Sequence, residues 1–264
     1  MKMNFERNTF GKRLRSMLNV DFRRMFATRL FYMMTGISFV IPILILVMTT
    51  MMGGTTSDPV TGETVIVETF TNTWQAIGSF SGSAVTMDLT GMCNINMIYF
   101  LAAVFVCIFV SGDFRCGYSK NLFAVRAKKN DYVISKTLVC FIGGVWMLIA
   151  FFVGAMLGGA IAGLSFDMGT AGIGGIVMCM LSKILLMAVF VPIYLVMSVA
   201  AKQKTWLSMC ASFAVGMLLF MMIPMMTPLN ATVVNVLFCF MGGVLFSAGL
   251  GAVSDLILKK TNLV

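Results

Sequence analysis

The chain has 264 residues, of which 59% are hydrophobic and only 11% are charged, and its formal net charge is +9. A soluble domain carries about one-quarter charged residues, so this composition excludes an ordinary soluble protein. Apolar runs near 20 residues recur along the chain, and about 20 residues of helix cross a hydrocarbon core of about 30 Å. The sequence therefore predicts an all-α, polytopic membrane protein.

The N-terminal segment, residues 1–30, holds eight basic residues and predicts an amphipathic helix. Its apolar residues recur at three- and four-residue steps and so share one helical face: Leu14, Met17, Leu18, Phe22, Met25 and Phe26. Basic residues and Asn19 fill the opposite face. A basic amphipathic helix next to a first span is typical of an interfacial helix that lies in the headgroup layer, where anionic lipids attract it.

Six apolar runs follow and predict a transmembrane domain over residues 31–254. We place the spans at about 31–52, 91–110, 137–162, 173–200, 206–226 and 232–254. The longest connections are then residues 53–90 and 111–136, and residues 255–264 form a tail.

The connections differ in charge, and this predicts the orientation. Alternate connections together hold 18 of the 19 Lys and Arg residues, whereas residues 53–90 hold four acids and no base. Because basic loops stay on the cytoplasmic side, we expect a multi-pass plasma-membrane protein with both termini in the cytoplasm. Residues 53–90 are then external; "TGETVIVETF" predicts a short strand, and this connection is expected to cap the external mouth.

The stretch 111–136, "SGDFRCGYSKNLFAVRAKKNDYVISK", carries six of the 19 basic residues. Ser111 and Asp113 are suitable caps for a short helix. Apolar residues then recur at helical spacing: Phe114, Tyr118, Leu122 and Val125. The pattern predicts a short amphipathic helix in the cytoplasm between the second and third spans. An interfacial loop held by anionic lipid is the alternative.

At this stretch the chain resembles a known family. A basic interfacial helix, six spans and a basic helix between spans two and three are similar to the permease subunits of ABC-2-type transporters, above all the small permeases of bacterial peptide export and bacteriocin immunity. The residues that carry the resemblance are Asp113, Gly117, Tyr118, Lys120 and Asn121 in "DFRCGYSKN" and Arg126, Tyr132 and Lys136 in "RAKKNDYVISK". Many members of the family have Glu where this chain has Asp113.

The resemblance implies that 111–136 contains a coupling helix that binds a cytoplasmic ABC ATPase. The residues that it assigns to this contact are Asp113, Arg115, Gly117, Tyr118, Lys120, Asn121 and Arg126. It also implies a second permease subunit, identical or related. The chain has no G-x-x-x-x-G-K-[ST] loop for a nucleotide phosphate, so ATP and magnesium are expected on the partner ATPase and no cofactor on this chain.

Small residues at four-residue spacing occur in two of the predicted spans. They are Gly154, Gly158, Gly159 and Gly163 in the third, and Gly243, Ser247 and Gly251 in the sixth. Such patterns allow helix backbones to approach closely. We expect packing within one chain, and a seam between two copies is the alternative.

Lys183 is the one basic residue that lies inside a predicted span. A lysine at the centre of a span costs about 2.5–3.5 kcal/mol on insertion scales, so an intramembrane charge is a candidate functional residue. We favour an amine that reaches the outer headgroups, and a place on the substrate path is the alternative.

Taken together, these patterns predict a transport subunit rather than an enzyme. The chain has no His and no C-x-x-C pair, so the usual metal ligands and general bases are lacking. The leading hypothesis is a permease that exports a hydrophobic or amphipathic substrate, such as a peptide, an antimicrobial or a lipid-like molecule. An ion-coupled secondary transporter is less favoured, because no acid lies centrally in a span. A membrane protein that binds a target without moving it stays open, and nothing in the sequence points to nucleic acid.

Overall fold

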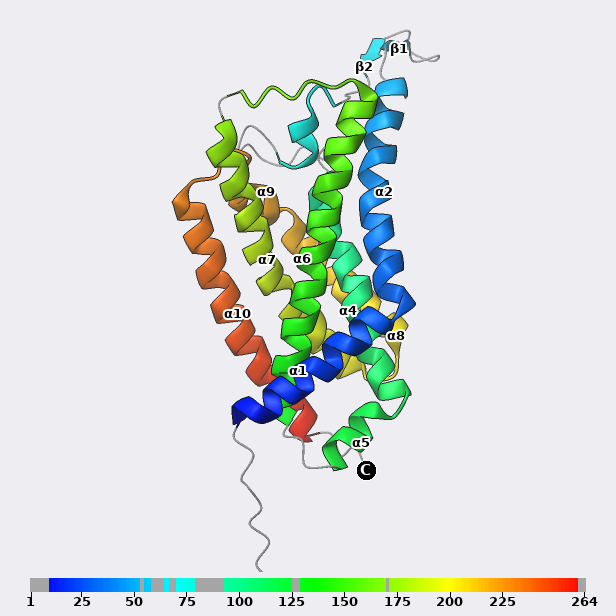
Figure 1. Cartoon of the computed structure of the whole chain (residues 1–264), viewed down its shortest axis with the longest axis vertical. Helices are drawn as coiled ribbons and strands as arrows, with labels where there is room; N and C mark the ends of the chain where they lie inside the picture. The colour runs from blue at the N-terminus through cyan, green and yellow to red at the C-terminus, as the bar shows by residue number, and fades with distance from the viewer. Residues whose placement is uncertain are drawn as a thin grey trace, which may run out of the picture.

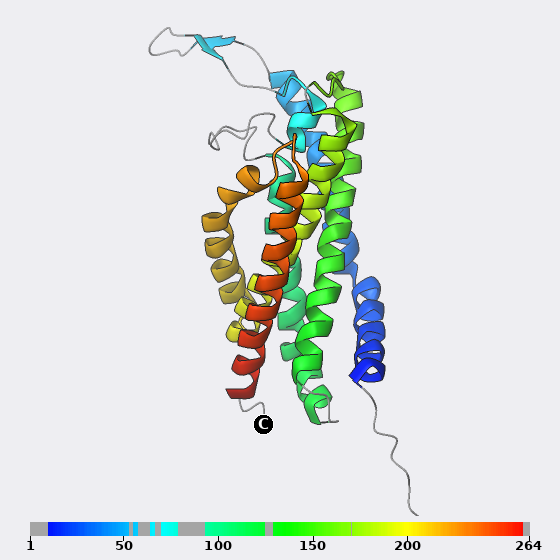
Figure 2. The same ribbon diagram turned by 90° about the vertical axis from the view of Figure 1, so that its left-hand side faces the viewer.

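A computed structural model describes residues 10–52, 55–57, 64–66, 70–78, 93–124, 129–169 and 171–260. Apart from two strands of three residues each, the regular structure in these ranges is helical. Figures 1 and 2 show an elongated bundle of long helices that run side by side, with one helix lying across its lower part.

Five helices are long and apolar enough to cross a membrane, and we describe the chain as a membrane protein. They are α2 (Arg29–Met52), α4 (Ile98–Arg115), α6 (Lys129–Ala162), α7 (Gly172–Ala201) and α10 (Val233–Lys260). Each coincides with a predicted apolar run, because backbone polar groups can be satisfied in lipid only within a helix or a closed sheet.

The fifth predicted span, 206–226, is divided into two helices. α8 (Thr205–Phe220) has 16 residues and α9 (Met222–Met226) has five. Pro224 in α9 has no N–H to donate to the carbonyl of Phe220, which is where α8 ends. The part of the chain that the structure describes thus contains five full-length apolar helices and one shorter apolar helix.

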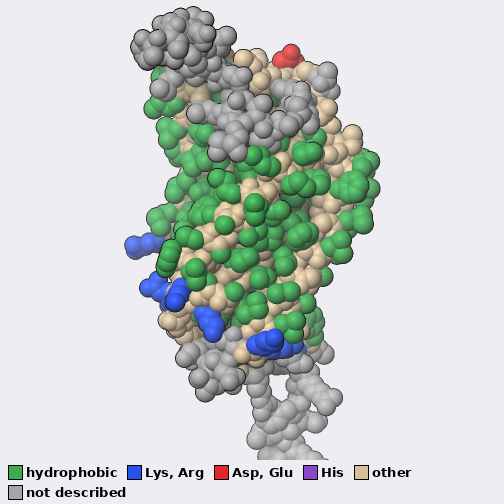
Figure 3. Space-filling model, turned by 180° about the vertical axis from the view of Figure 1, so that it is seen from behind, with side chains coloured by type: hydrophobic (Ala, Val, Ile, Leu, Met, Phe, Trp, Pro, Cys, Tyr) green, Lys and Arg blue, Asp and Glu red, His purple; other side chains and the backbone are tan. Residues whose placement is uncertain are grey.

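The two ends of the bundle differ in charge. We call the end at which α4, α7 and α10 finish the basic end, and the opposite end the far end. On the face shown in Figure 3, Lys and Arg gather towards the basic end, and a broad apolar band covers the middle of the bundle.

The predicted N-terminal helix is present as α1 (Phe10–Ala27). It lies at the basic end and crosses the long helices obliquely (Figure 1). Met17, Asp21 and Met25, four residues apart, are buried against the bundle. The apolar face that we expected to lie in the headgroup layer is therefore partly covered by protein: Met25 is 1% exposed, whereas Phe26 is 46% exposed.

The second and third spans extend further towards the basic end than predicted. α4 continues through Ser111 and Asp113 to Arg115, so neither residue caps a separate helix, and both side chains are buried. α6 begins at Lys129, seven residues before Lys136. The described residues between the two spans form a short turn and α5 (Tyr118–Ala124), a helix of seven residues.

At the far end, the described part of the 53–90 connection consists of a strand pair and a 3₁₀ helix. β1 (Thr55–Ser57) pairs antiparallel with β2 (Thr64–Ile66), where a short strand was predicted. The 3₁₀ helix η1 (Thr73–Ala76) packs on the bundle, and Trp74 Nε1 donates a hydrogen bond of 3.1 Å to the carbonyl of Phe166. The described part of this connection thus lies over the far end.

Four of the small residues in the two predicted patterns pack one long helix on another within the chain, whereas a Cβ on Gly163 or Gly251 would meet nothing within 4 Å and one on Gly159 would meet Thr73. A Cβ added to Gly154 would lie 2.2 Å from the carbonyl oxygen of Phe39, and one on Gly158 would lie 2.8 Å from the Cα of Ile43, so α6 contacts the backbone of α2 directly. On α10, Gly243 contacts α7, and Ser247 Oγ donates a hydrogen bond of 3.0 Å to the carbonyl of Ala188.

Candidate functional site

A buried group of four charged side chains lies at the basic end. We call it the basic-end cluster: Asp21 and Arg24 on α1, Asp113 on α4, and Lys136 on α6. Lys136 Nζ is 2.8 Å from Asp21 Oδ1 and 2.7 Å from Asp113 Oδ2. All three side chains are 0% exposed, so one ammonium bridges two carboxylates inside the protein.

Arg24 is the second cation of the basic-end cluster. Its Nη2 is 2.7 Å from Asp113 Oδ1, and its Nη1 is 3.9 Å from Asp21 Oδ1. Burial by itself lowers the pKa of Arg24, but the contact with Asp113 outweighs this effect and the pKa lies above its ordinary value. Two fixed cations therefore face two carboxylates, and the formal charges of the cluster cancel.

Two neutral side chains complete the hydrogen bonding of the two carboxylates. Ser135 Oγ donates to Asp21 Oδ2 at 2.7 Å, and the Tyr132 hydroxyl donates to Asp113 Oδ2 at 3.1 Å. All four carboxylate oxygens therefore have at least one donor. This matters because a buried charge is tolerated only when it is both paired and hydrogen-bonded.

Aromatic rings surround the two cations and connect α5 to the cluster. The Arg24 guanidinium lies 4.0 Å from the centroid of the Tyr118 ring, and Lys136 Nζ lies 4.3 Å from that of Phe109. Burial, with a contribution from Asp21, raises the pKa of the Tyr118 hydroxyl, so this ring stays neutral. Ser119 Oγ adds a weak hydrogen bond of 3.4 Å to the Asp113 carbonyl.

The basic-end cluster thus joins four helices, α1, α4, α5 and α6, at one point. A buried ion pair adds little stability compared with an apolar packing of the same volume, but removing one partner costs several kcal/mol. The cluster therefore fixes which side chains meet, and with them the angle at which α1 and α5 leave the spans. Among the described residues, no group of His, Cys, Asp and Glu suits a metal ion.

A second set of contacts surrounds the cluster at the basic end. Arg13 Nε is 3.1 Å from Asp131 Oδ2, which ties α1 to α6. Lys129 Nζ donates a hydrogen bond of 2.6 Å to the carbonyl of Leu258, which ties α6 to α10. Asp255 on α10 is 7% exposed and pairs with Lys259.

The residues that the resemblance assigned to an ATPase contact fall into two groups. Asp113 and Tyr118 belong to or touch the buried cluster. Arg115 and Asn121 are exposed, and Gly117 has a φ of 70° in the turn between α4 and α5. A positive φ suits glycine, so Gly117 allows the sharp change of direction.

Two further members of the predicted set can be placed only in part. Lys120 lies on α5, and Arg126 lies outside the described residues. Lys136, which we read as part of the family motif, is a buried member of the cluster rather than a surface residue.

Three residues of this site were missed by the sequence analysis: Asp21, Arg24 and Ser135. Asp21 did leave a signal. It is one of only two acids in the basic N-terminal segment, and it lies four residues from both Met17 and Met25 on the apolar face. An acid in that position on an otherwise apolar and basic helix indicates a buried partner.

The Lys183 amine is held inside the bundle and does not extend outward from the protein, as our preferred interpretation required. The side chain is 0% exposed, and its Nζ is 2.8 Å from Asn96 Oδ1 and 2.9 Å from Thr227 Oγ1. These two acceptors come from the start of the α4 segment and from the end of α9. The sequence does not bring either segment next to α7, and this is why the burial was not predicted.

Comparisons with known proteins give no relative for this arrangement. No family model matches the chain, and no curated protein or solved structure is detectably similar to it. The function must therefore be argued from the residues and their geometry.

Proposed function

We propose that the chain is the membrane subunit of an ATP-driven exporter, as its resemblance to ABC-2-type permeases implies. In this proposal the chain lies in the plasma membrane, the basic end faces the cytoplasm, and α5 is the helix that a soluble ATPase contacts. The substrate is hydrophobic or amphipathic, because the spans offer few polar groups to replace the hydration of a polar solute.

The observation that supports this proposal most is the way α5 is attached. α5 is short, carries the exposed residue Asn121, and follows directly after α4. Through Tyr118 and the basic-end cluster it is connected to α4, α6 and α1 at the same point. A force applied to α5 is therefore transmitted to two spans and to the N-terminal helix together.

The charge distribution supports the orientation. The Lys and Arg residues seen on the face in Figure 3 gather towards the basic end, and basic segments remain on the cytoplasmic side of a membrane. In the proposed orientation α5 lies on the cytoplasmic side, where a soluble ATPase would contact it. ATP and magnesium are then bound by that partner. The path along which the substrate moves forms between this chain and a second permease subunit.

Co-purification tests the proposal. The tagged chain is extracted from its native membrane in mild detergent, and a soluble polypeptide with a G-x-x-x-x-G-K-[ST] loop is expected to accompany it in constant ratio. A double variant on the exposed surface, in which Arg115→Glu reverses a charge and Asn121→Glu adds a negative one, is expected to release this polypeptide. Lys204→Glu, which is exposed in the α7–α8 connection, is the matched control.

The proposal fails if no ATPase accompanies the unaltered chain in several detergents while the chain itself stays folded. The basic stretch would then serve to hold the protein to anionic lipid, and a binding protein or a secondary transporter would be the better account.

A further inference from the structure

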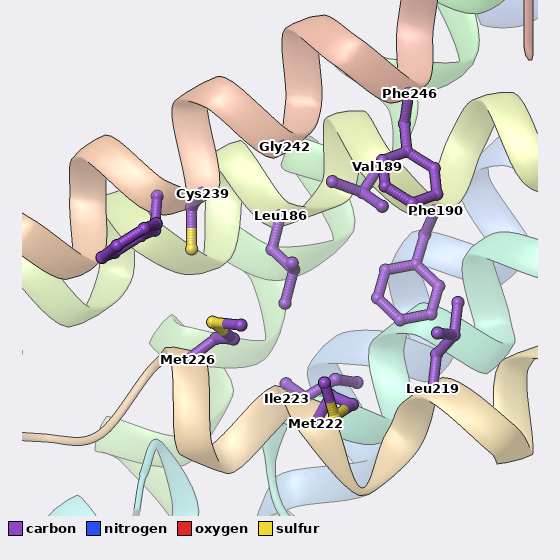
Figure 4. Close-up of a pocket in the computed structure, with 11 residues that line it drawn as sticks. Leu186, Val189, Phe190, Leu219, Met222, Ile223, Met226, Cys239, Gly242 and Phe246 are labelled. Carbon is purple, nitrogen blue, oxygen red and sulfur yellow. The ribbon is translucent and has the colours of Figure 1, made fainter. Parts of the chain in front are cut away.

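The far-end half of the bundle contains an apolar groove that opens to the surface between three helical segments. Its cavity volume is about 170 Å³. Leu186 and Phe190 of α7, Met226 of α9 and Cys239 and Phe246 of α10 point into it (Figure 4). Several lining side chains are partly exposed on the apolar surface, among them Met226 at 39% and Phe246 at 43%, so the groove is open towards lipid.

The groove runs along the helices and has a defined direction. α10 passes from the far end to the basic end, so Cys239 lies nearer the far end than Phe246 does. α7 runs the same way, so Leu186 lies nearer the far end than Phe190. The long axis of the groove is therefore close to the direction in which a lipid chain lies in one leaflet.

A buried cation lies just beyond the far-end limit of this groove. Lys183 precedes the lining residue Leu186 by three residues on α7 and so projects from the same side of that helix. Its acceptor Thr227 directly follows the lining residue Met226, and the thiol of Cys239 is close enough to interact electrostatically with the amine. Thr227 and Cys239 thus connect the amine to the edge of the groove.

Among the described residues, the partners of the Lys183 amine are all neutral. Its acceptors are the amide oxygen of Asn96 and the hydroxyl of Thr227. An ammonium has three donors, and a buried charge without an opposite charge is unfavourable. Both acceptors are held in place, since Asn94 caps the turn that carries Asn96 and Thr227 donates to the Ile223 carbonyl. No anionic group pairs with the amine in the part of the chain that the structure describes.

The depth of Lys183 agrees with a headgroup position. It precedes Ala201, the last residue of α7 at the basic end, by 18 residues, which is about 27 Å of helix. A hydrocarbon core of about 30 Å that begins near Ala201 therefore ends near Lys183. The cation lies at the level of headgroups, and the groove lies at the level of acyl chains.

We propose that Lys183 and this groove form a binding site for a single-chain amphiphile with an anionic head, which enters from the leaflet at the far end. The head displaces the flexible Met226 side chain and pairs with the Lys183 ammonium, and the chain lies along Leu186, Phe190 and Phe246. This site does not depend on the proposed ATPase, and its test uses binding alone.

The test is binding of radiolabelled dodecanoate to the purified full chain in dodecyl maltoside, measured by scintillation proximity. Unlabelled dodecanoate is expected to compete, and dodecanol, which has the same chain and a neutral head, is expected to compete at least about tenfold more weakly, because a hydrogen bond to a charged group is worth about 1.5–3 kcal/mol. Lys183→Gln is expected to weaken dodecanoate binding by about the same factor and to remove the preference over dodecanol.

A second variant tests the groove without touching the amine. Gly242 lines the groove, and a Cβ added there meets only Val189 at 3.6 Å, which is ordinary contact. Gly242→Leu fills the groove and is expected to abolish dodecanoate binding while the protein stays folded. Gly249→Leu is the matched control on the same helix, because its Cβ meets nothing within 4 Å and it does not line the groove.

Three results would overturn the proposal. Equal competition by dodecanol would mean that no charge is recognised. Unchanged binding in Gly242→Leu would mean that the chain lies elsewhere. The third concerns the acids of residues 53–90, which lie outside the described residues: if their joint neutralisation raises dodecanoate affinity tenfold, the amine already has its counter-charge.

Discussion

Lys136 and Arg24 show how individual residues determine the geometry of the basic end. Lys136 contacts two carboxylates that are both 0% exposed, and Arg24 shares one of them while remaining one-third exposed. If either cation is removed, the positive charge that remains no longer balances the two carboxylates of the cluster. The penalty should be larger for Lys136, because among the described cations it alone lies within hydrogen-bond distance of both carboxylates.

Lys136→Met is expected to destabilise the folded chain by about 3–5 kcal/mol, because it leaves a buried charge uncompensated. A lower melting temperature of the purified protein in detergent measures this. The double variant with Asp21→Asn is expected to recover part of the loss, since Asp113 keeps its close contact with Arg24 and Asp21 is the carboxylate left without a close cation. If the double variant is no more stable than the single one, the charges are not what holds this site together.

Arg24→Gln is expected to cost about 1–3 kcal/mol, the range for a lost hydrogen bond to a charged group. Its neighbour Arg23, which is exposed on α1, provides the matched control, and Arg23→Gln is expected to leave the melting temperature nearly unchanged. Equal effects of the two substitutions would contradict the placement of Arg24 in the cluster.

The helices of this fold were largely predictable, because length and hydropathy identify an apolar helix without any knowledge of its neighbours. α2 and α7 match their predicted ranges within two residues at each end. The errors occur where tertiary contacts extend or divide a helix. α6 begins eight residues early because its first two turns carry Tyr132, Ser135 and Lys136 into the buried cluster, and this cannot be read from hydropathy.

The candidate site was only partly predictable for the same reason. Asp113, Tyr118 and Lys136 lie in the stretch whose charge marked it as unusual. Asp21 and Arg24 are about 90 residues away in the chain, and the contact of α1 with α4 and α6 is a property of the packed bundle. Lys183 was identified as unusual from its position, but its acceptors Asn96 and Thr227 come from helix ends that sequence does not pair.

The close contact of α6 with α2 gives a test at the scale of elements. Gly154→Ala would place a Cβ 2.2 Å from the Phe39 carbonyl oxygen, so one backbone must move. We expect a loss of about 1–3 kcal/mol, the usual cost of overpacking, measured as a lower melting temperature.

Gly36→Ala is the matched control within the same helix pair, since a Cβ there meets nothing within 4 Å. Alanine favours the helix over glycine, so this variant should be at least as stable as the unaltered chain. Equal losses in both variants would show that the α2–α6 contact is looser than described.

The whole molecule combines two separate polar sites in an apolar bundle. The formal charges of the basic-end cluster cancel within the chain and its carboxylate oxygens are bonded, although Arg24 Nη1 has no hydrogen-bond partner among the described residues. At the Lys183 site near the far end, the acceptors among the described residues are all neutral. In our account the first transmits the action of a partner through α5, and the second receives an anionic group from the membrane.

Charge reversal on the connection between α4 and α6 tests the account in transport. Lys120→Glu together with Arg126→Glu is expected to abolish ATP-dependent transport while the amount of folded chain in the membrane stays the same, because the resemblance assigns both residues to the contact with the ATPase. Transport at the original rate would remove the coupling function from this connection.

The most direct measurement is photo-crosslinking in the native membrane from a photoreactive amino acid placed at Asn121, the exposed residue of α5. The same probe at Lys204 serves as the control. The account predicts that position 121 captures a polypeptide with a G-x-x-x-x-G-K-[ST] loop and that position 204 captures far less of it. If position 121 yields only lipid adducts, α5 is a membrane anchor, and the central claim that this chain is driven by an ATPase is wrong.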